Sequence, residues 1–97
     1  MKYFAWDNGK NAKLKAERGI WFEDVVFHIE RGGLLDTVDH PKRSRYAGQR
    51  MFIVRREQDV YLVPFVEDEH TMFLKTIIPS RKATKQYLGE ESDDHED

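Results

Sequence analysis

The sequence predicts an α+β domain in which two N-terminal helices and one C-terminal helix pack on an antiparallel sheet of four to five strands. The main observation is a series of three β-rich runs at residues 50–57, 60–67 and 71–78. Polar connections of only two and three residues separate them, which favours an antiparallel meander. Helical patterning on either side of this region is the second observation. A chain of 97 residues suffices for one domain, which we expect to span residues 1–89.

The N-terminal third is predicted to hold a short strand and two helices. The aromatic run at residues 3–6 predicts the strand. Asp7 is a suitable N-cap for a helix over residues 8–18, and Gly19 is a suitable stop. We expect the second helix at residues 22–31, because four apolar side chains recur there at the spacing of one buried helix face. These side chains are Phe22, Val25, Val26 and Ile29.

One further strand and a last helix complete the prediction. The strand is expected at residues 34–38, and the polar residues 40–49 are expected to form a loop. Pro64 lies inside the second β-rich run, and because proline lacks the N–H that a central strand uses, we expect either a bulge or an edge position there. Pro79 is expected to end the last strand, and Ser80 is a good N-cap for a helix that runs to residue 88.

The net charge of −2 conceals an uneven distribution of charge. Residues 90–97 carry six acids and no Lys or Arg, so residues 1–89 hold all 16 basic residues and the other 12 of the 18 acids. Residues 40–56 contribute six Lys or Arg and no acid. A locally basic body points to a polyanionic partner. We interpret the acidic end as a solvated, disordered segment; the sharper alternative is that it shields the basic face until RNA or a partner displaces it.

Composition excludes several classes of site. The chain has no cysteine, which rules out disulfides, thiolate zinc sites and cysteine nucleophiles. Its four histidines do not have the spacing of metal ligands, so we predict neither a metal nor a cofactor. No apolar run is long enough to span a bilayer, and the N-terminus lacks the core of a signal peptide. We therefore expect a cytoplasmic protein with no membrane partner.

The junction between the last strand and the last helix is the most informative segment for function. The free N–H groups at a helix start favour acidic side chains, yet the first turn here holds Arg81 and Lys82. Cations at a helix N-terminus instead create a site suited to phosphate.

Four segments form a pattern that extends beyond this junction. They are the aromatic-Trp-Asp start, Lys10-Asn11, Glu-Arg-Gly-Ile-Trp-Phe-Glu-Asp at residues 17–24 and Ser-Arg-Lys-Ala-Thr at residues 80–84. Together they resemble the BrnT family of type II toxins over about residues 3–88. The resemblance implies a fold similar to RelE-type ribonucleases and a metal-independent endoribonuclease activity that inhibits translation. It also implies neutralisation by a cognate antitoxin with a DNA-binding domain, with toxin dimers in the complex.

The chain departs from the common pattern of that family at three positions. Arg18 stands where the family commonly has His, Lys75 where it has Arg, and Tyr87 where it often has Glu. These departures keep a second hypothesis open, namely a catalytically inactive module of the same fold that binds RNA or protein.

Cleavage of RNA without a metal requires few protein groups. The 2′-hydroxyl is the nucleophile, so the site must bind phosphate, align the attack and stabilise the charge on the phosphorane. We therefore expect Arg81, Lys75 and Arg50 to be the catalytic cations. Further contacts to RNA are expected from Lys82, Arg18, Lys10, Tyr46 and Tyr87.

Overall fold

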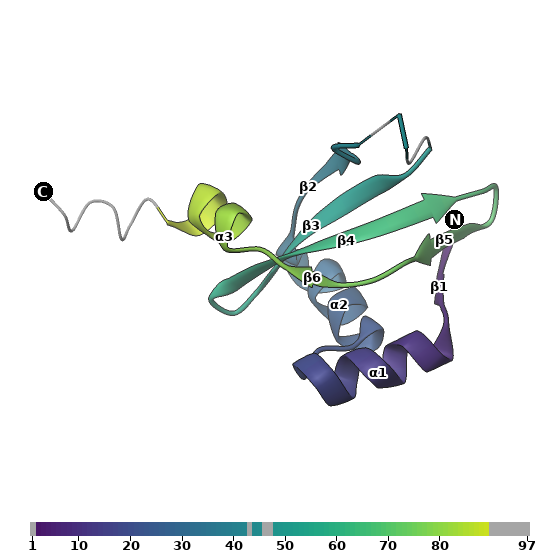
Figure 1. Ribbon diagram of the computed structural model, residues 1–97, viewed down its shortest axis with the longest axis horizontal. Coiled ribbons are helices and arrows are strands. Elements are labelled where there is room, and N and C mark those ends of the chain that lie inside the picture. The colour runs from purple at the N-terminus through teal and green to yellow at the C-terminus, as the bar shows by residue number, and fades with distance from the viewer. Residues whose placement is uncertain (1, 43, 46–47, 90–97) are drawn as a thin grey trace, which may run out of the picture.

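The computed structural model describes residues 2–42, 44–45 and 48–89 (Figure 1). Over these residues it has three α-helices and a mostly antiparallel sheet of six strands, so the predicted α+β class is confirmed. The helices are α1 (Asn8–Arg18), α2 (Phe22–His28) and α3 (Arg81–Leu88), with a π-helical turn η1 (Ile29–Gly33) after α2. The strands are β1 (Tyr3–Trp6), β2 (Leu34–Asp39), β3 (Arg50–Arg56), β4 (Asp59–Glu67), β5 (Thr71–Leu74) and β6 (Ile78–Pro79). The predicted acidic segment at residues 90–97 lies outside the described residues.

The sheet is built on the order β1-β5-β4-β3-β2, with β6 paired to β4 beyond the end of β5. β3, β4 and β5 pair antiparallel, as the short connections predicted, and β2 also pairs antiparallel with β3. β1 instead pairs parallel with β5, with Tyr3 opposite Thr71. This pairing places the start of the chain beside its last third, which the strand pattern did not predict.

The capping residues in the sequence predicted both ends of α1 correctly. The Asp7 carboxylate accepts a hydrogen bond from the backbone N–H of Lys10 at 2.7 Å, and Gly19 ends α1 in the left-handed conformation with φ of 69°. The second helix was predicted to continue to residue 31. Its α-helical part ends at His28, and the π-helical turn that follows contains Gly32 at φ of 94°.

The position of Pro64 corrects two predictions. Pro64 is buried in β4, in register with Met51 of β3, so it lies neither at an edge nor in a bulge of its own strand. Its carbonyl accepts a hydrogen bond from the Lys75 N–H at 2.8 Å, and its missing N–H therefore faces the same side. There the expected single strand at residues 71–78 is interrupted, because proline has no N–H with which to continue the ladder.

The irregularity in the pairing therefore lies in the segment opposite β4, between β5 and β6. Between the ends of β5 and β6, residues 75–77 lie opposite only two residues of β4, Val63 and Pro64. Pro79 pairs with Tyr61 as the last residue of β6, so the strand ends at Pro79 as predicted.

The two faces of the sheet have separate apolar clusters. α1 and α2 gather on one side of the sheet and α3 lies apart from them, near the end with the β3–β4 turn (Figure 1). The first cluster includes Phe22 and Val25 of the predicted helix face, both buried, and the Trp6 ring stacks on Phe22 at 5.6 Å. The second cluster joins Ile53, Val60 and Ala83, with Tyr87 and Leu88 of α3 packed against it.

Candidate functional site

The charges of the described residues are unevenly distributed over the fold. α1 and residues 75–89 together carry eight Lys or Arg and one acid, whereas the rest of the described chain carries seven Lys or Arg and eleven acids. We call the eight side chains of the first group the basic band. They are Lys10, Lys13, Lys15, Arg18, Lys75, Arg81, Lys82 and Lys85.

Arg18 joins the two halves of the basic band. Its Nη1 donates a hydrogen bond of 2.6 Å to the carbonyl oxygen of Ile77, in the segment between β5 and β6. Leu14 of α1 and Ile77 are also buried in the same apolar cluster. A guanidinium has five N–H donors, so one carbonyl occupies only part of its bonding capacity. The predicted RNA contact Arg18 is therefore first of all a link between α1 and this segment.

The start of α3 is fixed to β4 by a small group of hydroxyls. The Ser80 hydroxyl accepts from the Ala83 N–H at 3.0 Å, which confirms the predicted N-cap. The Thr84 hydroxyl donates to the Ser80 carbonyl at 2.7 Å and accepts from the Val60 N–H at 2.9 Å. The Ser80 N–H in turn donates to the Val60 carbonyl at 3.1 Å. These four bonds hold the first turn of α3 at a fixed place on the sheet.

The fixed turn presents two exposed cations. Arg81 and Lys82 are exposed, and neither makes an ion pair with any residue in the described part of the chain. Beside Arg81 lies a hollow of about 380 Å³. Its lining is Asp59, Val60, Tyr61, Pro79, Ser80, Arg81 and Thr84.

Lys75 lies farther from Arg81 than the sequence suggested. The Lys75 N–H donates a hydrogen bond to the Pro64 carbonyl on β4. The N–H of Ser80, the residue before Arg81, donates to the Val60 carbonyl on the same strand. Four residues of extended chain separate these points by about 13 Å. The Lys75 ammonium is placed over an aromatic ring of β5, 5.6 Å from its centre. The two cations therefore lie along one edge segment without meeting at a single point.

Arg50 lies on the other face of the sheet from Lys75. It is opposite Phe65, whose ring belongs to the cluster under α1 and α2, and its guanidinium is 5.8 Å from that ring. Lys75 bonds to the next residue along β4, Pro64, and successive side chains of a strand point to opposite faces. The three predicted catalytic cations are thus not brought together by the fold.

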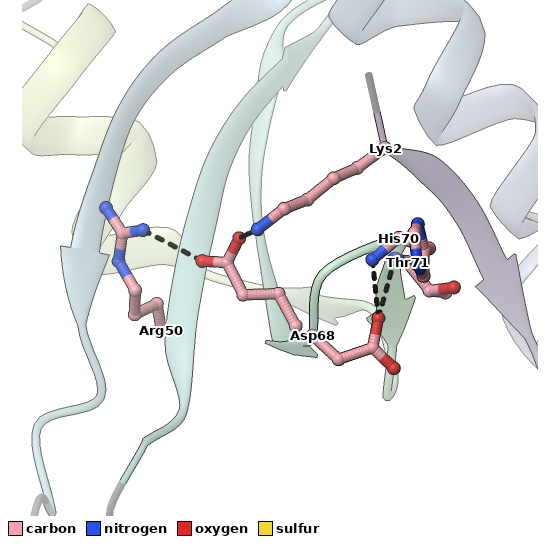
Figure 2. A network of polar contacts seen from close by, with 6 residues as sticks. Lys2, Arg50, Asp68, His70 and Thr71 are labelled. Carbon is pink, nitrogen blue, oxygen red and sulfur yellow. Dashed lines mark hydrogen bonds and ion pairs between the residues drawn. The ribbon is translucent and has the colours of Figure 1, made fainter.

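Arg50 already forms an ion pair with a carboxylate. Figure 2 shows Lys2 and Arg50 reaching from two sides toward the same group, which is the Glu67 carboxylate, at 2.5 Å and 3.1 Å respectively. The hydrogen bond from Lys2, and then that from Arg50, holds the pKa of Glu67 below its usual value. Next to it, the Asp68 carboxylate accepts from the backbone N–H groups of residues 70–71, which lowers the pKa of Asp68 as well. The connection between β4 and β5 is therefore held by specific hydrogen bonds.

The other predicted RNA contacts have different surroundings. The Lys10 side chain lies on the first turn of α1 and is partly buried. The Tyr87 hydroxyl donates to Asp36 of β2 at 3.2 Å, and burial, followed by the Asp36 charge, raises the pKa of Tyr87. Tyr87 thus attaches α3 to the sheet. Tyr46 lies outside the described residues.

Two arginines of the basic stretch at residues 40–56 are paired with carboxylates in the fold. Besides Arg50, Arg56 lies 2.6 Å from an oxygen of Asp24 on α2, and Arg55 donates to the backbone carbonyl of Glu57 at 2.9 Å. Arg55 and Arg56 are successive residues of β3, so their side chains point to opposite faces of the sheet.

Sequence reasoning missed three members of the basic band, Lys13 and Lys15 of α1 and Lys85 of α3. Lys15 lies 4.9 Å from the centre of the Trp21 ring. The available signal was the composition of α1, with four Lys or Arg and one acid in 11 residues.

No protein-family model, curated protein or solved structure matches the chain. The BrnT and RelE-like resemblance therefore stays a prediction. Among the described residues, no group of three or more His, Asp or Glu could hold a metal ion. No helix within the described ranges is long and apolar enough to cross a membrane.

The chemistry available to the basic band follows from its composition. Lys and Arg neutralise phosphates, and Arg can bind one phosphate through two N–H groups. The band contains no histidine, since the histidines of the described chain lie in other elements. The basic band is therefore suited to binding a polyanion and to stabilising negative charge.

Proposed function

We propose that the chain is the toxin of a type II toxin–antitoxin pair, a metal-independent endoribonuclease that inhibits translation in the cytoplasm. The basic band carries this proposal. α1 and residues 75–89, linked where Arg18 bonds Ile77, hold eight cations against one acid, and this excess of positive charge suits an RNA backbone. The resemblance at residues 17–24 and 80–84 supports it from the sequence side. The proposed partner is a cognate antitoxin with a DNA-binding domain that covers the band, with toxin dimers in the complex.

In the proposed mechanism Arg81 has the central role. It stands on the rigid first turn of α3, exposed and without an ion-pair partner among the described residues, so a phosphate can approach it. It stabilises the charge that develops on the phosphorane when the 2′-hydroxyl attacks. Lys75, about 13 Å along the edge, binds another phosphate of the same strand. Arg50 lies outside this proposed site, because Glu67 already holds it.

The substitution Arg81→Ala tests this mechanism. We expect it to lower the RNA cleavage rate by about 10²–10³-fold in the presence of a chelator, since that is the usual effect of losing one charge-stabilising donor. Growth arrest on expression should be lost as well. The control Arg55→Ala removes an exposed arginine outside the basic band. Equal cleavage by the wild type and by a folded Arg81→Ala variant would remove Arg81 from the mechanism.

The second candidate is an inactive module that binds RNA or protein through the same band. The observation that favours it is the separation of Arg81, Lys75 and Arg50 on the sheet. The purified wild-type protein and RNA in a chelator distinguish the candidates: cleavage supports the ribonuclease, whereas retention of intact RNA supports the module.

A further inference from the structure

The outer side of α3 is cationic and unpaired. Arg81, Lys82 and Lys85 are all exposed, and residues 75–89 contain no acid. None of the three makes an ion pair within the part of the chain that the structure describes, whereas Lys2 and Arg56 do. Uncompensated charges of one sign on a short helix repel one another and attract a segment of opposite charge.

The chain itself supplies such a segment directly after this helix. Residues 90–97 carry six acids and no Lys or Arg. α3 ends where the Gly89 N–H donates to the Lys85 carbonyl at 2.9 Å, so the acids follow the helix without a spacer. The eight residues of α3 are about 12 Å long, whereas eight residues of extended chain reach about 26 Å. The acidic segment is therefore long enough to return to Arg81.

We propose that residues 90–97 bind the cationic side of α3 in the same molecule and compete there with RNA. The contact itself follows from charge and reach alone; only the identity of the displaced ligand rests on the proposed function. Exposed ion pairs are individually weak, so the segment lowers affinity without blocking the surface.

The size of the effect follows from intramolecular competition. A ligand on a short flexible linker has an effective concentration in the millimolar range. The gain in RNA affinity on removing the segment is one plus the ratio of this effective concentration to the dissociation constant of the segment for α3. A ratio of about one to nine gives a gain of about 2- to 10-fold. Salt should abolish the difference at about 0.5 M, where the Debye length is about 4 Å.

The first experiment measures affinity in the full-length chain. All six acids are replaced by their amides, Glu→Gln and Asp→Asn, and the probe is a 2′-O-methyl RNA 12-mer, which cannot be cleaved. We expect the neutralised chain to bind about 2- to 10-fold more tightly at low ionic strength, and equally at high salt. The pair Glu90→Gln and Glu91→Gln is compared with Glu30→Gln and Glu69→Gln, which change the net charge equally outside α3. Equal effects of the two pairs would overturn the inference.

A double substitution on the helix locates the contact. In a chain with Lys82→Gln and Lys85→Gln, neutralising the acidic segment should change affinity less than it does in the wild type, because two of its three cationic partners are gone. An unchanged effect would show that the acids act through net charge and would contradict binding to α3.

A second readout needs no RNA. The backbone amide signals of Arg81 and Lys82 in ¹⁵N–¹H spectra are compared between the wild type and the neutralised chain. Both residues are at least eight positions from the nearest substitution. We expect both signals to shift at low salt, to the same extent after tenfold dilution. Unshifted signals, or shifts that vanish on dilution because a second copy supplies the segment, would contradict the inference. Shifted signals without RNA binding by any variant would instead contradict the proposed function alone.

Discussion

At the scale of single residues, Glu67 shows how the fold uses charge. Its carboxylate is shared between Lys2, at the start of the chain, and Arg50 on β3. These partners lower its pKa from the ordinary value of 4.5. A carboxylate with a lowered pKa contributes stability that is fully present above the ordinary value and is lost as the pH falls through the lowered one.

The substitution Glu67→Gln should therefore lower the thermal unfolding midpoint at pH 7 and have progressively less effect below pH 4.5. The measurement is the midpoint of wild type and variant from pH 7 to pH 3. Glu69→Gln is the control, because the Glu69 side chain is 91% exposed. A midpoint difference that stays constant over this range would contradict the assignment.

The same residues show where sequence reasoning reaches its limit. Arg50 and Arg56 lie in a stretch without acids, which made that stretch look basic. In the fold, Glu67 neutralises Arg50, and Asp24 lies beside Arg56. These partners depend on the register of β3 with β4 and on the docking of α2, neither of which is visible in a local pattern.

At the scale of elements, boundaries set by local chemistry were predictable. Asp7, Gly19 and Ser80 act within one turn of their own helices, and all three mark helix ends as predicted. The division of β5 from β6 was not predictable. It depends on Pro64 lying opposite residues 75–77, and no local rule specifies that pairing.

The docking of α3 on β4 depends on the Thr84 hydroxyl. Thr84→Val keeps the shape of the side chain but leaves the Val60 N–H without its partner, which should cost about 1–3 kcal/mol of unfolding free energy. Urea denaturation measures this change. Thr84→Ser retains the hydroxyl and should lose clearly less. A larger loss in Thr84→Ser than in Thr84→Val would mean that the methyl group, not the hydrogen bond, holds the helix.

At the scale of the whole molecule, the fold class was within reach of the sequence and the basic band was not. The meander and the flanking helices follow from periodicity and short connections. The band forms because Arg18 reaches Ile77, which is 59 positions away along the chain. Only the folded molecule brings the end of α1 against the segment that leads into α3.

The salt dependence of RNA binding tests the band as a unit. Each phosphate contact on a single strand contributes about 0.7 to the slope of log affinity against log salt concentration. Lys82→Gln should reduce that slope by about this amount, because Lys82 is exposed and unpaired among the described residues. Arg50→Gln should leave it unchanged, because Glu67 holds Arg50. Fluorescence anisotropy with the uncleavable 12-mer gives both slopes; equal reductions would refute the assignment.

The parallel pairing of β1 with β5 has a consequence for biosynthesis. β1 has one strand neighbour, and that neighbour begins at Thr71, opposite Tyr3. At about 5–20 residues per second, a ribosome needs about 3–14 s to make the chain between them. During that interval the nascent chain carries an unpaired apolar strand, and the ring of Phe22 lacks part of its final cover. β1 is therefore made well before its only neighbour in the described sheet, and a chaperone has several seconds in which to act on it.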